Sequence, residues 1–138
     1  MLLDVPINTT ESIDALLALK TWAVVGLSNN PERAAFGVAK LLQEKGHRII
    51  PVHPSAEVVH GQIGYSALTQ IPEPVDVVDC FVNSKLVGEV VDEAIKIGAK
   101  AIWLQLGVID DEAIKRAKAG GLITVMDQCP AIEYQKRS

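Results

Sequence analysis

The stretch from Trp22 to Gly37, WAVVGLSNNPERAAFG, joins an apolar run to a glycine, a polar turn and the start of a helix. Gly26 would allow a tight exit from a strand, while Ser28 and the first N–H groups of the helix could donate to a phosphate. Arg33 adds a permanent charge whose forked donors suit phosphate oxygens, and Gly37 could allow close packing of helix on sheet. We expect a phosphate-binding loop here; the alternative is a polar turn with a solvated Arg33.

The same loop departs from the dinucleotide pattern of a NAD site. Ser28 and Pro31 stand where that pattern has glycines, and the next strand ends in HRIIPVHPSAE, with no carboxylate before Glu57. A NAD site places a carboxylate about 20 residues on, to bind the ribose hydroxyls. The residues therefore favour a ligand with a phosphorylated ribose, either coenzyme A or NADP.

Apolar runs alternate with amphipathic stretches along the chain, which is typical of parallel strands joined by crossover helices. Lysine followed by glycine closes three of the helical stretches, in QEKGHRII, IKIGAKAI and KAGGLITV. Asn8 and Glu11 resemble a capping box. The pattern predicts strands at 22–27, 47–52, 75–82, 101–106 and 122–126, a short edge strand near 62–65, and helices at about 9–19, 34–45, 84–97 and 110–119.

These elements predict one α/β domain over residues 1–138, with residues 1–20 as an N-terminal helical extension. We expect a Rossmann-like, three-layer domain with a mostly parallel sheet of five to six strands and helices on both faces. The chain has 138 residues, of which 49% are hydrophobic and 4% aromatic, and a net charge of −4. That charge disfavours nucleic acid or an anionic membrane as partner, and we expect a cytoplasmic protein.

Four segments together closely resemble the stand-alone CoA-binding domain family. They are VVGLSNNPERAAFGVAKLLQEKGHRIIPVHP, IPEPVDVVDCFV, GAKAIWLQLGV and VMDQCPAIE, and the resemblance runs from about Trp22 to Glu133. The family is similar to the N-terminal domain of the succinyl-CoA synthetase α subunit and of ADP-forming acyl-CoA synthetases. His53 departs from its pattern, as do Val82 and Asn83, where relatives often carry arginines.

The resemblance implies a role for each loop at the carboxyl ends of the strands. The first loop would hold the phosphates of CoA, the second would border its adenosine end, the third would line the nucleotide and pantetheine path, and the fourth would lie near the thiol. The implied ligand-binding residues are Gly26, Leu27, Ser28, Arg33, Gly37, Pro51, Val52, His53, Pro54, Phe81, Val82, Asn83, Ser84, Gln105 and Gly107.

Other reactive side chains predict no catalytic or metal site. Cys129 lies on the ligand side, but no His or Lys is near it in sequence to activate the thiol. Trp103 is expected in the core and His47 on the surface at the opposite end of the sheet, and Asp79 needs a partner if it is buried. We therefore expect a non-catalytic module that binds CoA or an acyl-CoA. A small NADP-dependent oxidoreductase and an interaction subunit with a decayed site are the alternatives, and no protein partner is predicted.

Overall fold

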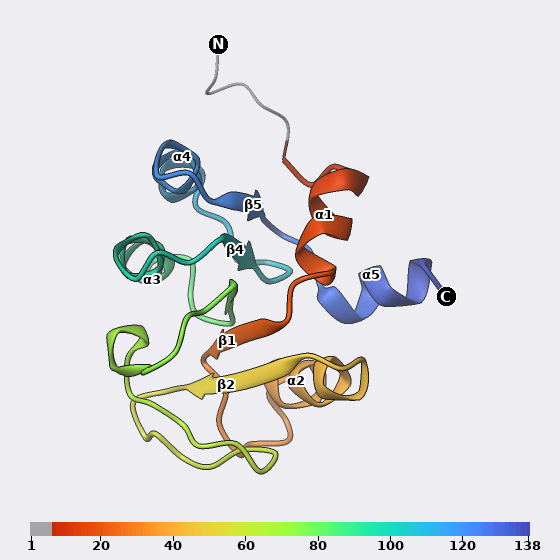
Figure 1. Cartoon of the computed structure of the whole chain (residues 1–138), viewed down its shortest axis with the longest axis vertical. Coiled ribbons are helices and arrows are strands. Elements are labelled where there is room, and N and C mark those ends of the chain that lie inside the picture. The colour runs from red at the N-terminus through yellow and green to blue at the C-terminus, as the bar shows by residue number, and fades with distance from the viewer. Residues whose placement is uncertain (1–6) are drawn as a thin grey trace.

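The computed structural model of the chain describes residues 7–138 as a parallel sheet between two layers of helices (Figure 1). None of its helices is long and apolar enough to cross a bilayer. The elements in chain order are α1 (Thr10–Leu17), β1 (Thr21–Val25), α2 (Ala34–Glu44), β2 (Arg48–Val52), the 3₁₀ helix η2 (Leu68–Gln70), β3 (Val77–Cys80), α3 (Val87–Lys96), β4 (Ala101–Leu104), α4 (Asp111–Ala119), β5 (Ile123–Val125) and α5 (Pro130–Lys136).

The five strands are all parallel and follow the order β2-β1-β3-β4-β5. The chain therefore moves outward from β1 to β2 and then returns to place β3 on the other side of β1. This reversal creates a topological switch point between the carboxyl ends of β1 and β3, where sheets of this kind bind their ligands. We call the side of the sheet at which all five strands end the carboxyl edge.

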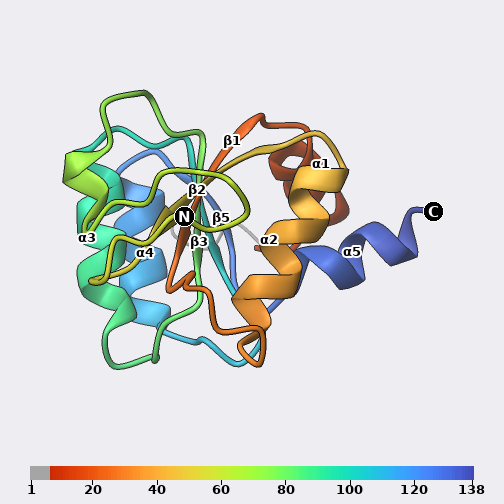
Figure 2. The same cartoon turned by 90° about the horizontal axis from the view of Figure 1, so that it is seen from below.

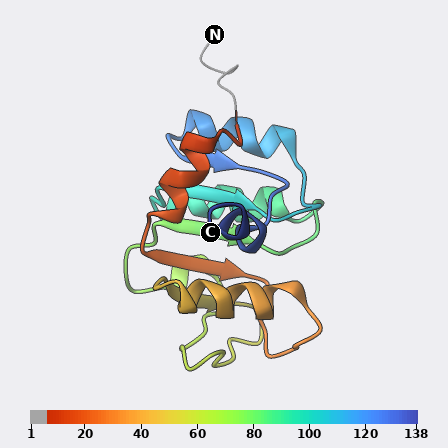
Figure 3. The ribbon, with the colours of Figure 1, turned by 90° about the vertical axis from the view of Figure 1, so that its right-hand side faces the viewer.

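Alternate residues of each strand pack into two separate cores, one on each face of the sheet. Figure 2 shows the helices on the two sides of the sheet. Val24, Val77 and Trp103 point to the face covered by α1, α2 and α5, which Figure 3 shows from outside. Cys80 and Ile102 point to the face covered by α3 and α4. Nearly continuous apolar strands are what a sheet covered on both faces requires.

The predicted architecture is confirmed, with three differences in detail. The edge strand expected near 62–65 is reduced to isolated bridges, of which one pairs Val52 with Tyr65. Helix α5 was not predicted, because seven residues show too little periodicity. The cap of α1 is Thr9, whose hydroxyl accepts the Ser12 N–H, whereas Asn8 has a φ of 59° and binds the backbone of Met126 instead.

The closest backbone approach beside the switch point involves Gly26, the residue after β1. Its φ is +98°, and a Cβ atom placed on it would lie 2.4 Å from the carbonyl oxygen of Phe81 after β3. Its N–H donates to the Val52 carbonyl at 2.7 Å. Gly37 was expected to allow close packing on the sheet, and this is wrong: it is exposed, and a Cβ there would meet nothing within 4 Å.

His47 was expected on the surface, and this is also wrong. It is 9% exposed and packs against Trp22 at a ring-centroid distance of 5.2 Å. Its Nδ1–H donates to the Leu19 carbonyl at 2.8 Å, and its Nε2 pairs with the hydroxyl of Tyr134 on α5. Sequence reasoning missed this contact because the helix that supplies Tyr134 was itself missed.

The two glycines should respond to alanine with opposite signs. Gly26→Ala should lower the free energy of unfolding by about 1–3 kcal/mol or more, because of the positive φ and the overlap with Phe81. Gly37→Ala should raise it by about 0.4–1 kcal/mol, because alanine restricts the unfolded chain and fits the open helical position. Urea denaturation of both variants tests this, and equal effects would contradict the geometry.

His47 should make the fold sensitive to mild acid. Burial lowers the pKa of His47 from its usual 6.5, so below pH 6.5 the unfolded chain binds a proton that the folded chain resists. The contribution of neutral His47 is complete above pH 6.5 and is lost as the pH falls through the lowered value. Unfolding free energies measured between pH 7 and 5 should therefore fall less steeply in His47→Gln than in the wild type.

The matched control for this measurement is His53→Gln, which changes a histidine on a loop at the carboxyl edge. This variant measures how much the pH slope of the unfolding free energy changes when a histidine outside the buried core is replaced. A His47→Gln variant with an unchanged slope would show that the buried imidazole is not the group responsible.

Candidate functional site

The loop between β1 and α2 is held in shape by its own polar side chains. Ser28 Oγ accepts the N–H of Asn30, and Asn30 Oδ1 accepts the N–H of Glu32 at 3.0 Å. Asn29 donates its side-chain amide to the Val58 carbonyl at 2.9 Å, and its backbone N–H donates to Glu57. These bonds fix the path of the loop away from Gly26 and set the position at which α2 begins.

Helix α2 begins at the carboxyl edge without the usual compensation of its N-terminus. Its N-cap residue, Arg33, makes no side-chain capping bond, and its first turn carries no acidic residue. Each of α1, α3, α4 and α5 has an acidic residue in its first turn. Within the described part of the chain, the N–H groups of Ala34 and Ala35 have no acceptor. The positive end of the helix dipole is therefore left open.

The charge of Arg33 adds to that positive end. Arg33 is exposed, and its guanidinium has no partner among residues 7–138. A cation at a helix N-terminus is electrostatically unfavourable by itself. The same arrangement becomes favourable when an anion binds between the guanidinium and the open N–H groups.

The residues predicted at the end of β2 are divided between the core and the surface. Pro51 and Val52 are buried, and their carbonyls already accept the N–H groups of Tyr65 and Gly26. His53 is half-buried, and its Nδ1 accepts the Ser55 N–H at 3.1 Å. That bond assigns the proton of a neutral His53 to Nε2, which is left as a free donor next to the exposed Pro54.

The loops after β3 and β4 are tied to each other. Ser84 Oγ accepts the N–H of Ile109 at 2.9 Å and contacts the Gly107 carbonyl at 3.5 Å. Gly107, with a φ of +83°, donates its N–H to Asp127 at 2.7 Å. Phe81 and Val82 are half-buried and Asn83 is exposed, so these predicted residues line the surface beside Gly26. Leu27 is 1% exposed and supports the site from the core.

Two buried polar residues, Asp79 and Gln105, lie on the face of the sheet that α1, α2 and α5 cover. Asp79 in β3 is 0% exposed, and neither of its carboxylate oxygens has a hydrogen-bond partner within residues 7–138. Gln105, directly after β4, is 7% exposed, and its Oε1 also lacks a partner. Burial raises the pKa of Asp79 well above its usual value. The expectation that a buried Asp79 would find a partner is not met by the described residues.

The other reactive groups are built into the core. Cys129 is a buried free thiol at the N-cap of α5. Trp103 is 0% exposed, as predicted, and its Nε1–H donates to the Gln128 carbonyl at 2.8 Å. Within residues 7–138, no group of three or more His, Cys, Asp or Glu side chains could hold a metal ion.

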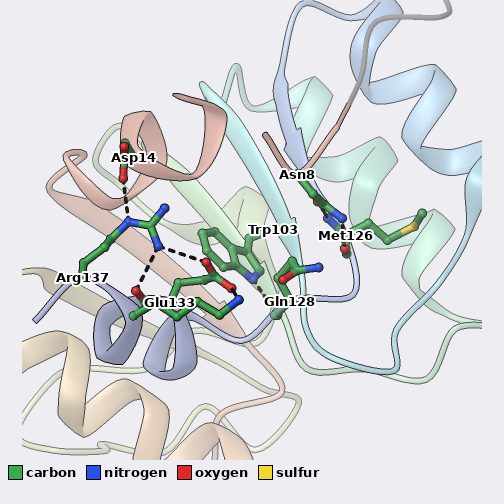
Figure 4. Close-up of polar contacts among 8 residues, drawn as sticks. Asn8, Asp14, Trp103, Met126, Gln128, Glu133 and Arg137 are labelled. Carbon is green, nitrogen blue, oxygen red and sulfur yellow. Dashed lines mark hydrogen bonds and ion pairs between the residues drawn. The ribbon is translucent and has the colours of Figure 1, made fainter. Parts of the chain in front are cut away.

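A cavity of about 400 Å³ lies away from the switch point, between α1 and α5. Figure 4 shows its charged wall, where Arg137 bridges Asp14 on α1 and the buried Glu133 on α5. Asn8, next to it, makes its paired bonds with Met126. Because these charges neutralise one another, the cavity offers no unpaired charge to a ligand, in contrast to the N-terminus of α2.

Comparison with known proteins identifies a family for this arrangement. The model of the CoA binding domain family matches residues 20–135. The protein YneT of Bacillus subtilis is 36% identical over 127 residues, which are 92% of this chain and 94% of YneT. A solved hypothetical protein from Pyrococcus horikoshii has a TM-score of 0.88 and 42% identity, and the match covers 93% of this chain and 91% of that one.

A larger enzyme contains a similar segment. The α subunit of acetate–CoA ligase (ADP-forming) II from Pyrococcus furiosus is 33% identical over 81 residues, which are 58% of this chain but 18% of that subunit. The resemblance seen in the strand-end loops thus extends to a family match over residues 20–135 and to a segment of a CoA ligase subunit. The chain belongs to the CoA-binding domain family.

Proposed function

We propose that this protein binds CoA or an acyl-CoA at the carboxyl edge, with the ligand's phosphates at the N-terminus of α2. The observation that carries the proposal is that α2 combines an uncapped N-terminus with a cationic N-cap residue, Arg33. A phosphate would accept the open N–H groups of Ala34 and Ala35 and pair with the guanidinium. Gly26 contributes to this site through the backbone, because its close approach to Phe81 sets where the loop to α2 leaves the sheet.

The adenosine end of the ligand would lie beside the end of β2. The first carboxylate after this strand, Glu57, accepts the Asn29 N–H and lies in an exposed loop. The edge therefore offers His53 Nε2 as a donor, rather than a carboxylate that accepts from the two ribose hydroxyls of NAD. This favours a ribose phosphate, such as the 3′-phosphate of CoA.

The pantetheine arm would follow the loops after β3 and β4, past Phe81–Ser84 and toward Gln105 and Gly107. The thiol on this side, Cys129, is buried in the core and has no described histidine or lysine contact to activate it. The protein would thus act as a binding module. The ligase activity of the Pyrococcus furiosus relative belongs to a subunit of which this chain matches 18%.

Loss of the Arg33 charge should weaken binding without unfolding the protein. Arg33→Ala removes a charge-assisted hydrogen bond worth about 1.5–3 kcal/mol, so the Kd for CoA measured by titration calorimetry should rise roughly 10- to 100-fold. Lys40→Ala is the matched control, because Lys40 is an exposed cation further along the same helix. If the wild type and Arg33→Ala bound CoA with equal Kd values, Arg33 would be a solvated residue of a polar turn and not a phosphate ligand.

The preference among ligands should depend on the phosphates that each ligand carries and on the lack of a carboxylate between the end of β2 and Glu57. CoA at about 100 times its Kd adds about 2.7 kcal/mol to the stability of the folded state, which should raise the Tm by about 5–10 °C in a thermal-shift measurement. Dephospho-CoA should give a smaller shift, because it lacks the 3′-phosphate, and NAD should give none.

NADP is the decisive competitor in this measurement, because it carries a ribose phosphate without a pantetheine arm. A larger shift with NADP than with CoA would overturn the proposal and favour a small oxidoreductase. The absence of a shift with every ligand would favour an interaction subunit that has lost its site.

A further inference from the structure

Asp79 is an unusual residue for the centre of a parallel sheet. It lies in β3 with Val24 of β1 on one side and Trp103 of β4 on the other. Like these two neighbours, it lies on the face of the sheet covered by α1, α2 and α5, where it is 0% exposed and lacks a described partner. The two indole N–H groups of this core donate to backbone carbonyls, at Leu19 and Gln128, and do not reach it. A buried carboxyl group without a hydrogen-bond donor lowers the stability of the fold, so we expect its presence to serve a function.

Gln105 is the polar residue placed to meet Asp79. The Gln105 N–H donates to the Cys80 carbonyl at 3.1 Å, which extends the β3–β4 register by one residue and sets Gln105 beside Phe81. Asp79 and Gln105 are therefore diagonal neighbours on the same face of adjacent strands. Such diagonal pairs lie within reach of long side chains.

The unpartnered atoms of this pair are all oxygens. Asp79 contributes both carboxylate oxygens and Gln105 contributes Oε1, so three buried acceptors at diagonal positions of neighbouring strands have no donor within the described residues. A proton on the carboxyl group removes the buried charge and converts one of its oxygens into a donor for Gln105 Oε1, which leaves one neutral carboxyl oxygen as an acceptor. Burial favours the neutral acid, because it raises the pKa of Asp79.

We propose that protonated Asp79 donates a hydrogen bond to Gln105 Oε1 and thereby positions the Gln105 amide to donate from Nε2 to a carbonyl oxygen of the pantetheine arm. The inference rests on the proposed function. Within the described residues, Gln105 Nε2 makes no hydrogen bond. Unlike Oε1, it is not fully buried, so it is the part of the Gln105 side chain that a ligand can reach. Asp79 is then a positioning residue, and Gln105 is the group that contacts the ligand.

Two substitutions of Asp79 separate this role from a structural one. Asp79→Asn keeps a neutral side chain with a donor, so the Kd for CoA should stay within about twofold of the wild-type value. Asp79→Leu keeps the branched shape and removes the donor, so the Kd for CoA should rise about fivefold, as expected for one hydrogen bond. A merely structural carboxyl group would not distinguish the two variants in this way.

A ligand without the pantetheine arm separates this inference from the proposed function. Adenosine 3′,5′-bisphosphate should bind Gln105→Leu and Asp79→Leu as tightly as it binds the wild type, whereas Arg33→Ala should weaken both this probe and CoA. Gln105→Leu also covers the case in which Asp79→Leu fails to fold, and it should lose CoA affinity about fivefold. Thr124→Val is the control. Thr124 is a buried polar residue of β5 on the face of the sheet that α3 and α4 cover, so this variant should bind CoA as tightly as the wild type.

The inference is overturned if Gln105→Leu binds CoA as tightly as the wild type, or if Asp79→Asn loses as much affinity as Asp79→Leu. Failure of wild-type protein to bind either CoA or the bisphosphate would instead overturn the proposed function itself. The two failures are therefore distinguishable in the same set of calorimetric titrations.

Discussion

The contact between the backbones of Gly26 and Phe81 is the constraint on which the carboxyl edge depends. β1 and β3 are neighbours at the centre of the sheet, and their loops leave toward opposite faces, one to α2 and the other to α3. The two loops can separate there only if the first residue after β1 has no side chain, since a Cβ would lie 2.4 Å from the Phe81 carbonyl oxygen. The place at which the loop to α2 leaves the sheet follows from that separation.

The electrostatics of α2 differ from those of the other helices in a consistent way. α1 and α4 receive side-chain caps from Thr9 and Asp110, whereas α2 has an arginine at the same position. A missing cap costs about 1 kcal/mol, and a cation beside the positive end of a dipole adds to the cost. The sequence therefore gives up stability at α2, which follows β1 beside the switch point, and in the proposed function a bound anion would recover it.

The sequence predicted the architecture because its signals are local and repeated. Apolar runs and lysine–glycine helix ends repeat along the chain, and Gly46, Gly98 and Gly121 all have the positive φ that such ends require. Long-range contacts were not predictable in this way. The pairing of His47 with Tyr134 and that of Asn8 with Met126 join residues 87 and 118 positions apart. For the candidate ligand residues, the order of the strands along the sequence indicated which loops form the site. It did not indicate which side chains are buried, and Pro51 and Val52 are both buried.

Asp79 and Arg33 together suggest how stability and binding are divided in this domain. Asp79 carries a carboxyl group that is buried without a described partner. Arg33 places a cation at the N-terminus of α2, which is the positive end of the helix dipole. Local rules are broken most often at functional sites, where a ligand supplies the missing partner. Asp79 lies on the face of the sheet that α1, α2 and α5 cover, and Arg33 lies at the start of α2. In the proposed function, a ligand phosphate would compensate Arg33, whereas the hydrogen bond that we propose from Asp79 to Gln105 would satisfy the buried carboxyl group and place the Gln105 amide at the other end of the ligand's path.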